Sequence, residues 1–391
     1  MSTTAAGAGP ASTHRHNVAL LMRLIARSAP VSRVELARRC GLTKATVSSL
    51  VNDLIAAELV RDLGPGQGNG PGRPAGRLVL DPYGPVAVGL QFAADHIAGV
   101  VVDLSGRPVA RRVRRTEVTG LEPEAATRAA RPVLRRLFED ATAAGRLIAG
   151  VGVTVGGVVR GGREPMLTWA PALGWREVDL RALVSAELRA VDLFGVEVFA
   201  AGEVACAALA EYQAGAAQDW LYLGGEEVIG LAALDPAVPL AGDLGHVRVR
   251  RRGEPCPCGG HGCLDRYAGR AAIAAAAGLD GPGPSRLLGD EDPLAARVRQ
   301  GDEAALRALD RAADALAEAL LPVRALLAPE TIVLGGWLGS LGEPFRKRVL
   351  DRTGPGLTVR QAKLDPDAAL RGAAGTVIAR LIEDPLAWMD G

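Results

Sequence analysis

Aromatic residues, cysteines and long apolar runs are all scarce in this chain of 391 residues. Phe, Trp and Tyr make up 4% of it although 48% is hydrophobic, a composition that fits a water-soluble α/β protein of two or three domains. No apolar run has membrane-spanning length, and the first residues lack the charged-then-apolar pattern of a signal peptide. With the isolated Cys40 and Cys206, these absences favour the reducing cytoplasm and no membrane contact.

The other three of the five cysteines fall within eight positions, and a histidine precedes them by ten residues. Thiolate and imidazole are preferred zinc ligands, and a closed structural site needs four. This spacing therefore predicts a zinc site built from His246, Cys256, Cys258 and Cys263. His261 competes as a ligand, and a disulfide or a set of free buried thiols is the alternative.

A net charge of +1 hides an asymmetry between the two ends of the chain. Residues 1–80 hold ten Lys or Arg and four acidic residues, a net charge of +6, so the remainder carries −5. A basic module on an acidic body is typical of a protein whose first domain binds a polyanion. Solvated arginine-rich helices are the alternative explanation.

Helical patterns over residues 17–28 and 32–40, and a third beginning with Thr43 as its N-cap, predict a helix-turn-helix. Ser32 and Glu35 form a capping-box pattern at the start of the second helix, and Gly41 ends it. We expect a disordered Ala/Gly/Ser-rich arm over residues 1–15 and a DNA-binding domain over residues 16–82. In the third helix one stripe is apolar, at Val47, Leu50, Val51 and Leu54.

The opposite face of the third helix is polar and is the predicted reading surface for double-stranded DNA. Its candidate contacts are Thr43, Lys44, Ser48 and Ser49. Strand-like runs at 59–61 and 78–80 flank a Gly/Pro-rich loop, a pattern that predicts a wing with Arg73 entering the minor groove. A three-helix domain followed by a plain linker is the alternative.

From residue 86 onward, apolar strand-like runs alternate with Ala-rich helical segments, which predicts an α/β sheet architecture. The strand-like runs are residues 86–90, 97–104, 147–155, 221–224 and 332–336, and the helical segments are 122–144, 204–214 and 304–328. Several of these strands end in glycine turns, which by themselves are weak evidence for phosphate binding.

Residues 83–391 resemble the ROK family of repressors, open reading frames and sugar kinases, and the whole chain resembles its regulator branch. The resemblance rests on the Gly245-His246 and cysteine motif with Asp265 behind it, on the segment 170–180, on 332–336, and on the preceding winged helix. It implies a bilobal, actin-like ATPase fold with a sugar site in the cleft. The small lobe would span about 83–200 plus a C-terminal helix at 371–391, and the large lobe about 201–370.

Kinases of this family carry an Asp-x-Gly-Gly-Thr loop after the first strand, whose amides hold the ATP phosphates. Residues 90–94 of this chain, Leu-Gln-Phe-Ala-Ala, do not match that loop. Because phosphoryl transfer depends on holding and neutralising the phosphates, the departure argues against kinase activity. The family's Asn-Asp pair, whose Asp is the general base, is replaced by Gly202 and Glu203.

Acidic residues remain at every position that matches the family's sugar site. By the resemblance, Glu203, Asp243, His246 and Asp265 would bind the hydroxyl groups of a sugar or sugar-phosphate effector. His246 would use one ring nitrogen for zinc and the other for ligand or carboxylate. Acids that no longer bind anything are the alternative.

The favoured hypothesis is a DNA-binding transcriptional regulator, a repressor acting on a double-stranded operator as a homodimer or tetramer, without enzymatic activity. A sugar or sugar derivative would control it, and zinc would brace the sensor. The competing hypotheses are an ATP-dependent sugar kinase with a DNA-binding head, and a ligand-blind DNA-binding dimer.

Overall fold

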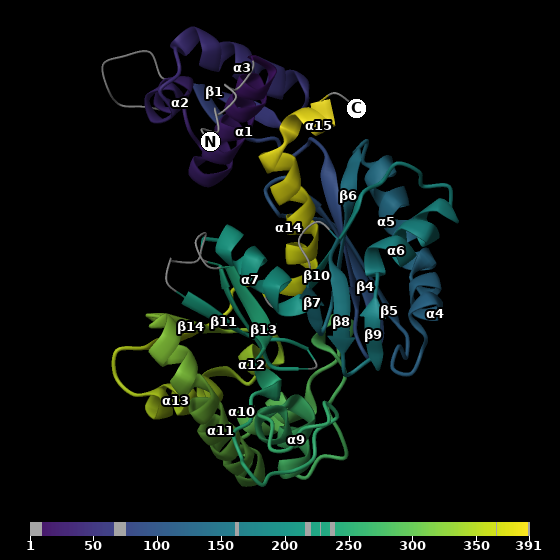
Figure 1. Ribbon diagram of the computed structural model, residues 1–391, viewed down its shortest axis with the longest axis vertical. Coiled ribbons are helices and arrows are strands. Elements are labelled where there is room, and N and C mark those ends of the chain that lie inside the picture. The colour runs from purple at the N-terminus through teal and green to yellow at the C-terminus, as the bar shows by residue number, and fades with distance from the viewer. Residues whose placement is uncertain are drawn as a thin grey trace, which may run out of the picture.

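The computed structural model describes residues 10–65, 76–160, 164–215, 220–226, 228–234, 239–364 and 366–389. Three parts follow one another along its long axis (Figure 1): an N-terminal head, a lobe with a five-stranded sheet, and a second such lobe. Among the described residues, no helix combines the length and the apolar character needed to cross a bilayer.

The head is a winged helix-turn-helix, as predicted. The wing strands pair antiparallel and the three helices enclose a core that includes the apolar stripe of the third helix. Its elements are α1 (Pro10–Ser28), α2 (Arg33–Cys40), α3 (Lys44–Ala56), β1 (Val60–Pro65) and β2 (Gly76–Leu80). Helix α1 begins at Pro10, so the expectation of a disordered arm reaching residue 15 is wrong from residue 10 onward. Arg73 lies outside the described residues.

The caps of α2 follow the sequence signals with one exception. The Ser32 hydroxyl accepts the Glu35 amide hydrogen at 3.2 Å, and Gly41 ends the helix with a φ of 72°. The Glu35 carboxylate instead accepts hydrogen bonds from Arg38 and Arg39, so the predicted return contact to the cap amide is replaced by two charged ones. These bonds, with Arg38 first, lower the pKa of Glu35 to about 2.

The first lobe is a mixed sheet in the order β10-β6-β3-β4-β5, with helices on both faces. Its strands are β3 (Val86–Phe92), β4 (His96–Asp103), β5 (Pro108–Arg115), β6 (Ile148–Val155) and β10 (Val198–Gly202), and its helices α4 (Pro123–Ala129), α5 (Arg131–Ala143) and α6 (Leu180–Arg189). The predicted helix 122–144 is interrupted at Ala130, because Pro132 starts a new helix. A small antiparallel sheet adjoins the lobe, made of β7 (Val158–Arg160), β8 (Met166–Ala170) and β9 (Trp175–Val178).

The second lobe has the sheet order β13-β12-β11-β14-β15. Its strands are β11 (Trp220–Gly224), β12 (Gly230–Leu234), β13 (Pro239–Asp243), β14 (Thr331–Leu334) and β15 (Thr358–Gln361). Its helices are α7 (Glu203–Gln213), η1 (Leu244–His246), α8 (Asp265–Ala268), α9 (Arg270–Ala276), η2 (Arg286–Leu288), α10 (Pro293–Arg299), α11 (Glu303–Leu327), α12 (Gly336–Ser340) and α13 (Gly342–Thr353). The two sheets, each joined to helices, are the α/β architecture that the sequence predicts.

Helix α14 (Ala368–Glu383) runs back from the second lobe along the first and ends beneath the head, followed by α15 (Pro385–Met389) (Figure 1). It packs closely on α7, where a Cβ at Gly372 would overlap the carbonyl oxygen of Cys206. At its other end, Leu381 is buried in the core of the head, and Arg15 of α1 pairs with Asp384 at 2.5 Å. One helix therefore contacts α7, the first sheet and the DNA-binding head.

Candidate effector site and metal cluster

The four predicted metal ligands converge, although no element longer than the short helix η1 holds any of them. All their ligand atoms lie within 4.8 Å of one another. The Cys256 sulfur lies 3.4 Å from His246 Nδ1, and the Cys258 and Cys263 sulfurs are 3.5 Å apart. In a tetrahedral zinc site with bonds of about 2.3 Å to sulfur, neighbouring sulfurs lie about 3.8 Å apart. The arrangement thus fits a metal ion in tetrahedral coordination by four protein ligands.

The loop around the cysteines folds back on itself so that the sulfurs face one point. Bridges pair Arg248 with Cys263 and Pro255 with His261, and the Gly260 amide donates to the Cys258 sulfur at 3.3 Å. The side chain of His261 is exposed, and it does not join the four-residue group, so it is not the competing ligand that the spacing allows. All five cysteines are described and none of them is in a disulfide, so the structure does not support the disulfide alternative.

His246 connects this cluster to a second group of side chains. Its Nδ1 faces Cys256, while its Nε2 lies 3.4 Å from an Asp243 carboxylate oxygen. Trp169 of β8, in the small sheet beside the first lobe, covers the imidazole with ring centroids 4.5 Å apart. A metal-bound histidine whose second nitrogen faces a carboxylate has its orientation fixed from both sides.

Asp243, His246 and Asp265 form the second group, with their ligand atoms within 4.8 Å of one another. Asp265 accepts the Ile229 amide hydrogen at 3.2 Å. Burial, and then the negative charge of Asp243, raises the pKa of Asp265 to about 7, and burial also raises the pKa of Asp243. A side chain at Gly245 would collide with the Asp265 carboxylate, so the glycine of the motif has a steric reason.

A small pocket between the lobes adjoins Asp243. Its walls are mostly backbone and small side chains, contributed by Gly156, Gly157, Gly202, Gly230 and Gly242 among others. Walls without bulky side chains allow hydroxyl groups of a ligand to approach the backbone closely. A ligand bound in this pocket between the lobes would therefore contact the carboxylate of Asp243.

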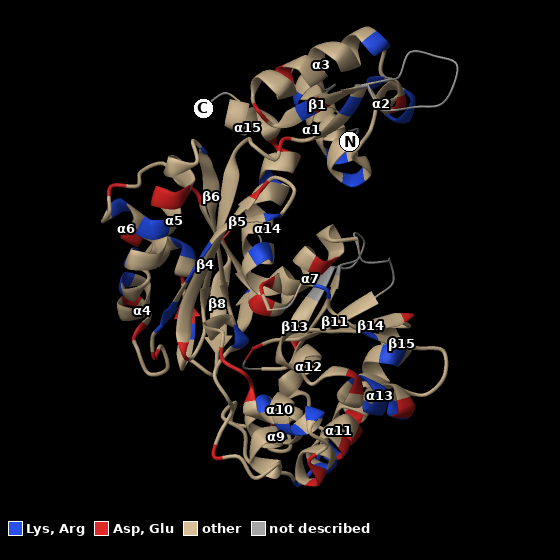
Figure 2. Ribbon diagram, turned by 180° about the vertical axis from the view of Figure 1, so that it is seen from behind, with Lys and Arg blue, Asp and Glu red and all other residues tan. Residues whose placement is uncertain are grey.

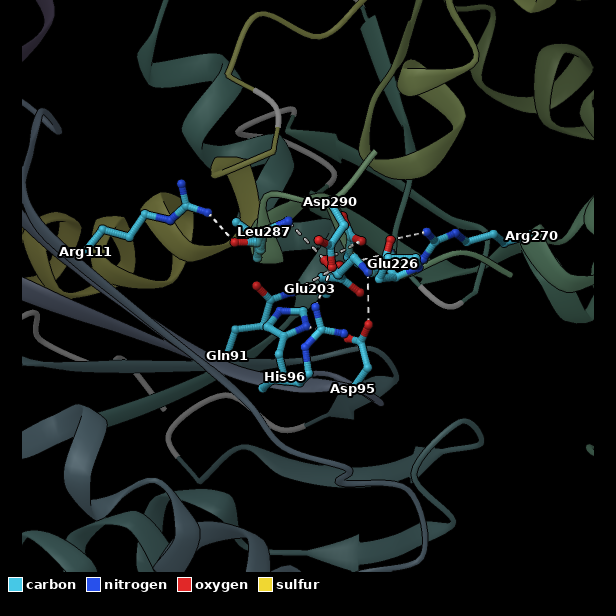
Figure 3. Close-up of polar contacts among 12 residues, drawn as sticks. Gln91, Asp95, His96, Arg111, Glu203, Glu226, Arg270, Leu287 and Asp290 are labelled. Carbon is cyan, nitrogen blue, oxygen red and sulfur yellow. Dashed lines mark hydrogen bonds and ion pairs between the residues drawn. The ribbon is translucent and has the colours of Figure 1, made fainter. Parts of the chain in front are cut away.

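Glu203, the fourth predicted ligand-binding residue, is buried at the start of α7 and belongs to a different network (Figure 3). Its carboxylate accepts hydrogen bonds from Gln91 Nε2 at 3.4 Å and from the Glu226 amide at 3.0 Å. Because Gln91 is in the first lobe and Glu226 in the second, Glu203 connects the two lobes. It does not join the group of Asp243, His246 and Asp265.

The turn after the first strand, where the family's kinases hold phosphates, is a short hairpin between β3 and β4 in this chain. Phe92 is buried in the core of the lobe beside Trp175, with ring centroids 5.9 Å apart. The Ala93 amide bonds to the carbonyl of His96, so the turn closes as a plain hairpin. Asp95 in this turn accepts hydrogen bonds from His96 at 2.6 Å and from the Ser285 amide at 2.9 Å. Burial raises the pKa of Asp95, but these bonds outweigh it and hold the pKa below its usual value.

The predicted DNA contacts lie at the N-terminal end and on the outer face of α3. Thr43 caps the helix by accepting the Thr46 amide hydrogen at 3.2 Å, and its side chain is exposed, as are those of Lys44 and Ser49. Ser48 is half-buried. Figure 2 shows basic residues gathered on and around the neighbouring helix α2. This end of the head therefore offers polar and positive groups to solvent.

Sequence reasoning missed Trp169, Asp95, His96 and Ser285. Trp169 directly precedes the Ala170-Pro171 segment used for the family resemblance, so its position was available as a signal. The other three meet only because the loop before α10 reaches the first lobe, and nothing in their local sequence indicates that contact.

Comparison with known proteins supports both halves of the architecture. Residues 87–380 match the model of the ROK family, and residues 16–67 match the model of the MarR family. The xylose repressor of Bacillus subtilis is 27% identical over 266 residues, which is 66% of each chain and so just under two thirds of that relative. The glucokinase of Streptomyces coelicolor is 27% identical over 320 residues, covering 74% of this chain and 96% of that enzyme.

Among solved structures, the crystal structure of a regulator described as a homologue of the E. coli MLC protein is similar over almost the whole molecule. The TM-score is 0.75 at 19% identity, covering 97% of this chain and 100% of that one. This likeness shows a shared fold for head and body together.

Proposed function

Because the chain belongs to the ROK family and carries a winged helix-turn-helix ahead of the family domain, we propose that it is a sugar-responsive transcriptional repressor. The observation that carries this proposal is the path of α14, which contacts α7 at the lobe junction and completes the core of the DNA-binding head. A body joined to the head in this way can change the head's position when its two lobes move.

On the DNA side, α3 enters the major groove of a double-stranded operator. Thr43, Lys44, Ser48 and Ser49 contact bases or phosphates. A homodimer presents two such heads to a two-fold symmetric operator, and a tetramer presents four. The protein then works in the cytoplasm, where its thiols stay reduced.

On the metal side, zinc bound by His246, Cys256, Cys258 and Cys263 has a structural role. Four protein ligands leave no open coordination position, so the ion supplies rigidity and charge balance for the thiolates, with no reactive water. The consequence for this chain is that His246 keeps its Nε2 directed at Asp243. The metal therefore braces the ligand side of the cleft.

On the ligand side, the site binds the hydroxyl groups of an aldose or its derivative. The carboxylates of Asp243 and Asp265 accept hydrogen bonds from these hydroxyl groups, and the imidazole of His246 exchanges hydrogen bonds with them. Glu203 completes the site from the lobe junction. The named function of the Bacillus subtilis relative supports a pentose such as xylose among the first compounds to test. A ligand shifts the lobes only if it binds one arrangement of them better than the other. Sugar binding would then lower operator affinity through α7 and α14.

Kinase activity is the second candidate, favoured by the similarity to a glucokinase and by the carboxylate of Glu203 near the position of the family's base. The buried Phe92 and the hairpin closed by Ala93 argue against it, because they leave the phosphates without a cradle. A coupled assay for ADP release, run over pentoses, hexoses and N-acetylhexosamines, decides between the two. We expect no turnover above background.

The repressor function is tested by titrating the protein onto DNA from upstream of its own gene at about 50–100 mM salt. We expect a specific complex that a saturating aldose dissociates, and no such loss with mannitol as an acyclic control. Absence of any specific complex in that salt range would refute DNA-binding regulation. A complex that no sugar or sugar phosphate weakens would favour the ligand-blind alternative.

A further inference from the structure

The segment 284–290 leaves the second lobe between α9 and α10 and reaches the first lobe. We refer to it as the strap; it contains the short helix η2. Arg270 of α9 donates to the Pro284 carbonyl at the start of the strap, at 2.7 Å, and to Asp292, which follows its end and caps α10, at 3.2 Å. Arg270 and Asp292 are 6% and 5% exposed, so this ion pair is a buried anchor at the base of the strap.

The tip of the strap is inserted in the core of the first lobe. Leu287 is 4% exposed and packs with Ala98 and Val100 of β4 and with Leu370 and Ala374 of α14. Arg111 of β5 donates to the Leu287 carbonyl at 2.9 Å (Figure 3). A leucine from one lobe thus fills the core of the other, next to the helix that leads to the head.

Polar contacts attach the same segment to the turns on both sides of the cleft. The Ser285 amide donates to Asp95 in the turn after the first strand, at 2.9 Å. Arg286 donates to the carbonyl of Gly336, in the glycine turn that follows β14, at 2.8 Å. The Ser285 hydroxyl contacts Glu226 at 3.3 Å, and Glu226 in turn contacts Glu203 through its amide. The strap therefore lies between the two turns that face each other across the lobes.

We propose that the strap is a built-in clasp, which closes this side of the cleft and holds the two lobes together there. A leucine in the core and hydrogen bonds to both turns must break before the lobes separate on this side. Lobe movement is then confined to the rest of the cleft, which includes the pocket beside Asp243. A nucleotide, whose phosphates would bind between such glycine turns, has to displace the strap first.

Limited proteolysis tests the clasp, because trypsin cuts after Arg286 only when the strap has left its seat and become extended. Cleavage tracks the population of the open form when opening is fast. In the full-length protein, Leu287→Ala should raise the rate of cleavage at the Arg286–Leu287 bond by at least about tenfold, because the tip of the strap loses most of its packing in the first lobe. Leu287→Met, which keeps the volume, should retain the protection of the wild type.

The matched control is Leu294→Ala, which truncates a buried leucine of α10 in the second lobe outside the strap. It should leave cleavage at Arg286 within about twofold of the wild type at matched fractions of folded protein. Equal cleavage rates in Leu287→Ala and the wild type would overturn the proposal, as would equal acceleration by Leu294→Ala. Peptide masses identify the bond that is cut, so cleavage elsewhere does not confuse the result.

A second measurement uses Mg·ATP as the probe. With the strap seated, wild-type protein should give no binding heat at about 1 mM Mg·ATP, and its cleavage at Arg286 should not change. Binding of Mg·ATP while Arg286 stays protected would show that the nucleotide side is open beneath the strap, and this would overturn the clasp. Neither measurement depends on DNA binding or on the identity of the sugar.

Discussion

The two sides of the cleft between the lobes differ in what occupies them. On one side, Asp243 borders a pocket lined by glycine, alanine and valine, and it lies beside His246, which belongs to the group of candidate metal ligands. On the other side, the strap from the second lobe fills the space with a buried leucine and backbone hydrogen bonds.

This difference separates, within one fold, the groups that we propose to bind a sugar from the place where the family's kinases hold phosphates. Recognition of hydroxyl groups needs carboxylates and an imidazole in fixed positions, and these groups remain. Phosphoryl transfer needs a phosphate cradle as well, and the residues at that place now hold the lobes together. The first side is therefore where we propose that a ligand binds, and the second is where we propose that the strap holds the lobes together.

The largest expected effect concerns the proposed zinc site beside the ligand pocket. Cys258→Ser removes one of four ligands, so zinc affinity should fall by at least about 100-fold, and the melting temperature by about 10 °C, because metal binding contributes to folding. Metal analysis and thermal unfolding check this, with Cys40→Ser as the control that should keep the metal. Stoichiometric zinc in the Cys258 variant would show that the ligand set is different.

The next effect compares the two sides directly. Asp243→Asn should weaken the binding of a responsive aldose by about 30-fold, the equivalent of about 2 kcal/mol for a lost charged hydrogen bond. Asp290→Asn makes the same change on the exposed pair with Arg115 on the strap side and should leave binding unchanged. Thermal-shift titrations measure both, alongside zinc content. Equal losses would mean that the two sides do not divide recognition and structure as described.

A smaller effect extends the comparison from the cleft to the head. Lys44→Ala should weaken operator binding by about tenfold at 100 mM salt and reduce the salt slope by about 1, because one phosphate contact is lost. Lys347→Ala makes the same charge change on the body, where Lys347 pairs with Asp351, and serves as the control. Fluorescence anisotropy at several salt concentrations separates them. An unchanged slope would move the phosphate contact away from α3.

The smallest effect concerns the joint between head and body. Arg15 and Asp384 form an exposed ion pair, so Arg15→Ala should change the free energy of unfolding by less than about 1 kcal/mol. Leu381→Ala, in the buried part of the same joint, should cost about 2–5 kcal/mol. Denaturant titration measures both. A large effect of Arg15→Ala would mean that the head is held by charge and not by packing.

Much of the head and of the metal cluster could be predicted from the sequence because their signals are local. A cap, a turn glycine and an apolar stripe act within a few residues, so Ser32, Gly41 and Leu50 were placed correctly. Where a local signal competes with a nearby charge, it fails, as at Glu35, which binds two arginines instead of the cap amide. The start of α1 was also missed, since its first turns lack apolar periodicity.

Within the cleft, the family resemblance pointed to Asp243, His246 and Asp265, and the structure brings them together because one short segment carries them all. Glu203 was assigned to the same group, yet its contacts are with Gln91 and Glu226 at the lobe junction. The strap was not predicted at all. Its decisive contact joins Asp95 and Ser285, which are 190 residues apart, and no residue pattern near either indicates the other.

The sequence by itself determined the winged helix, the alternation of strands and helices, and the four residues of the candidate metal site, because each depends on neighbours along the chain. Only the tertiary structure decided that the strap lies between the lobes, and that α14 connects the lobe junction to the head. Those outcomes depend on how distant surfaces fit, such as Leu287 in the core of the first lobe and Gly372 against α7. Such fits are set by packing in three dimensions, for which local patterns hold no signal.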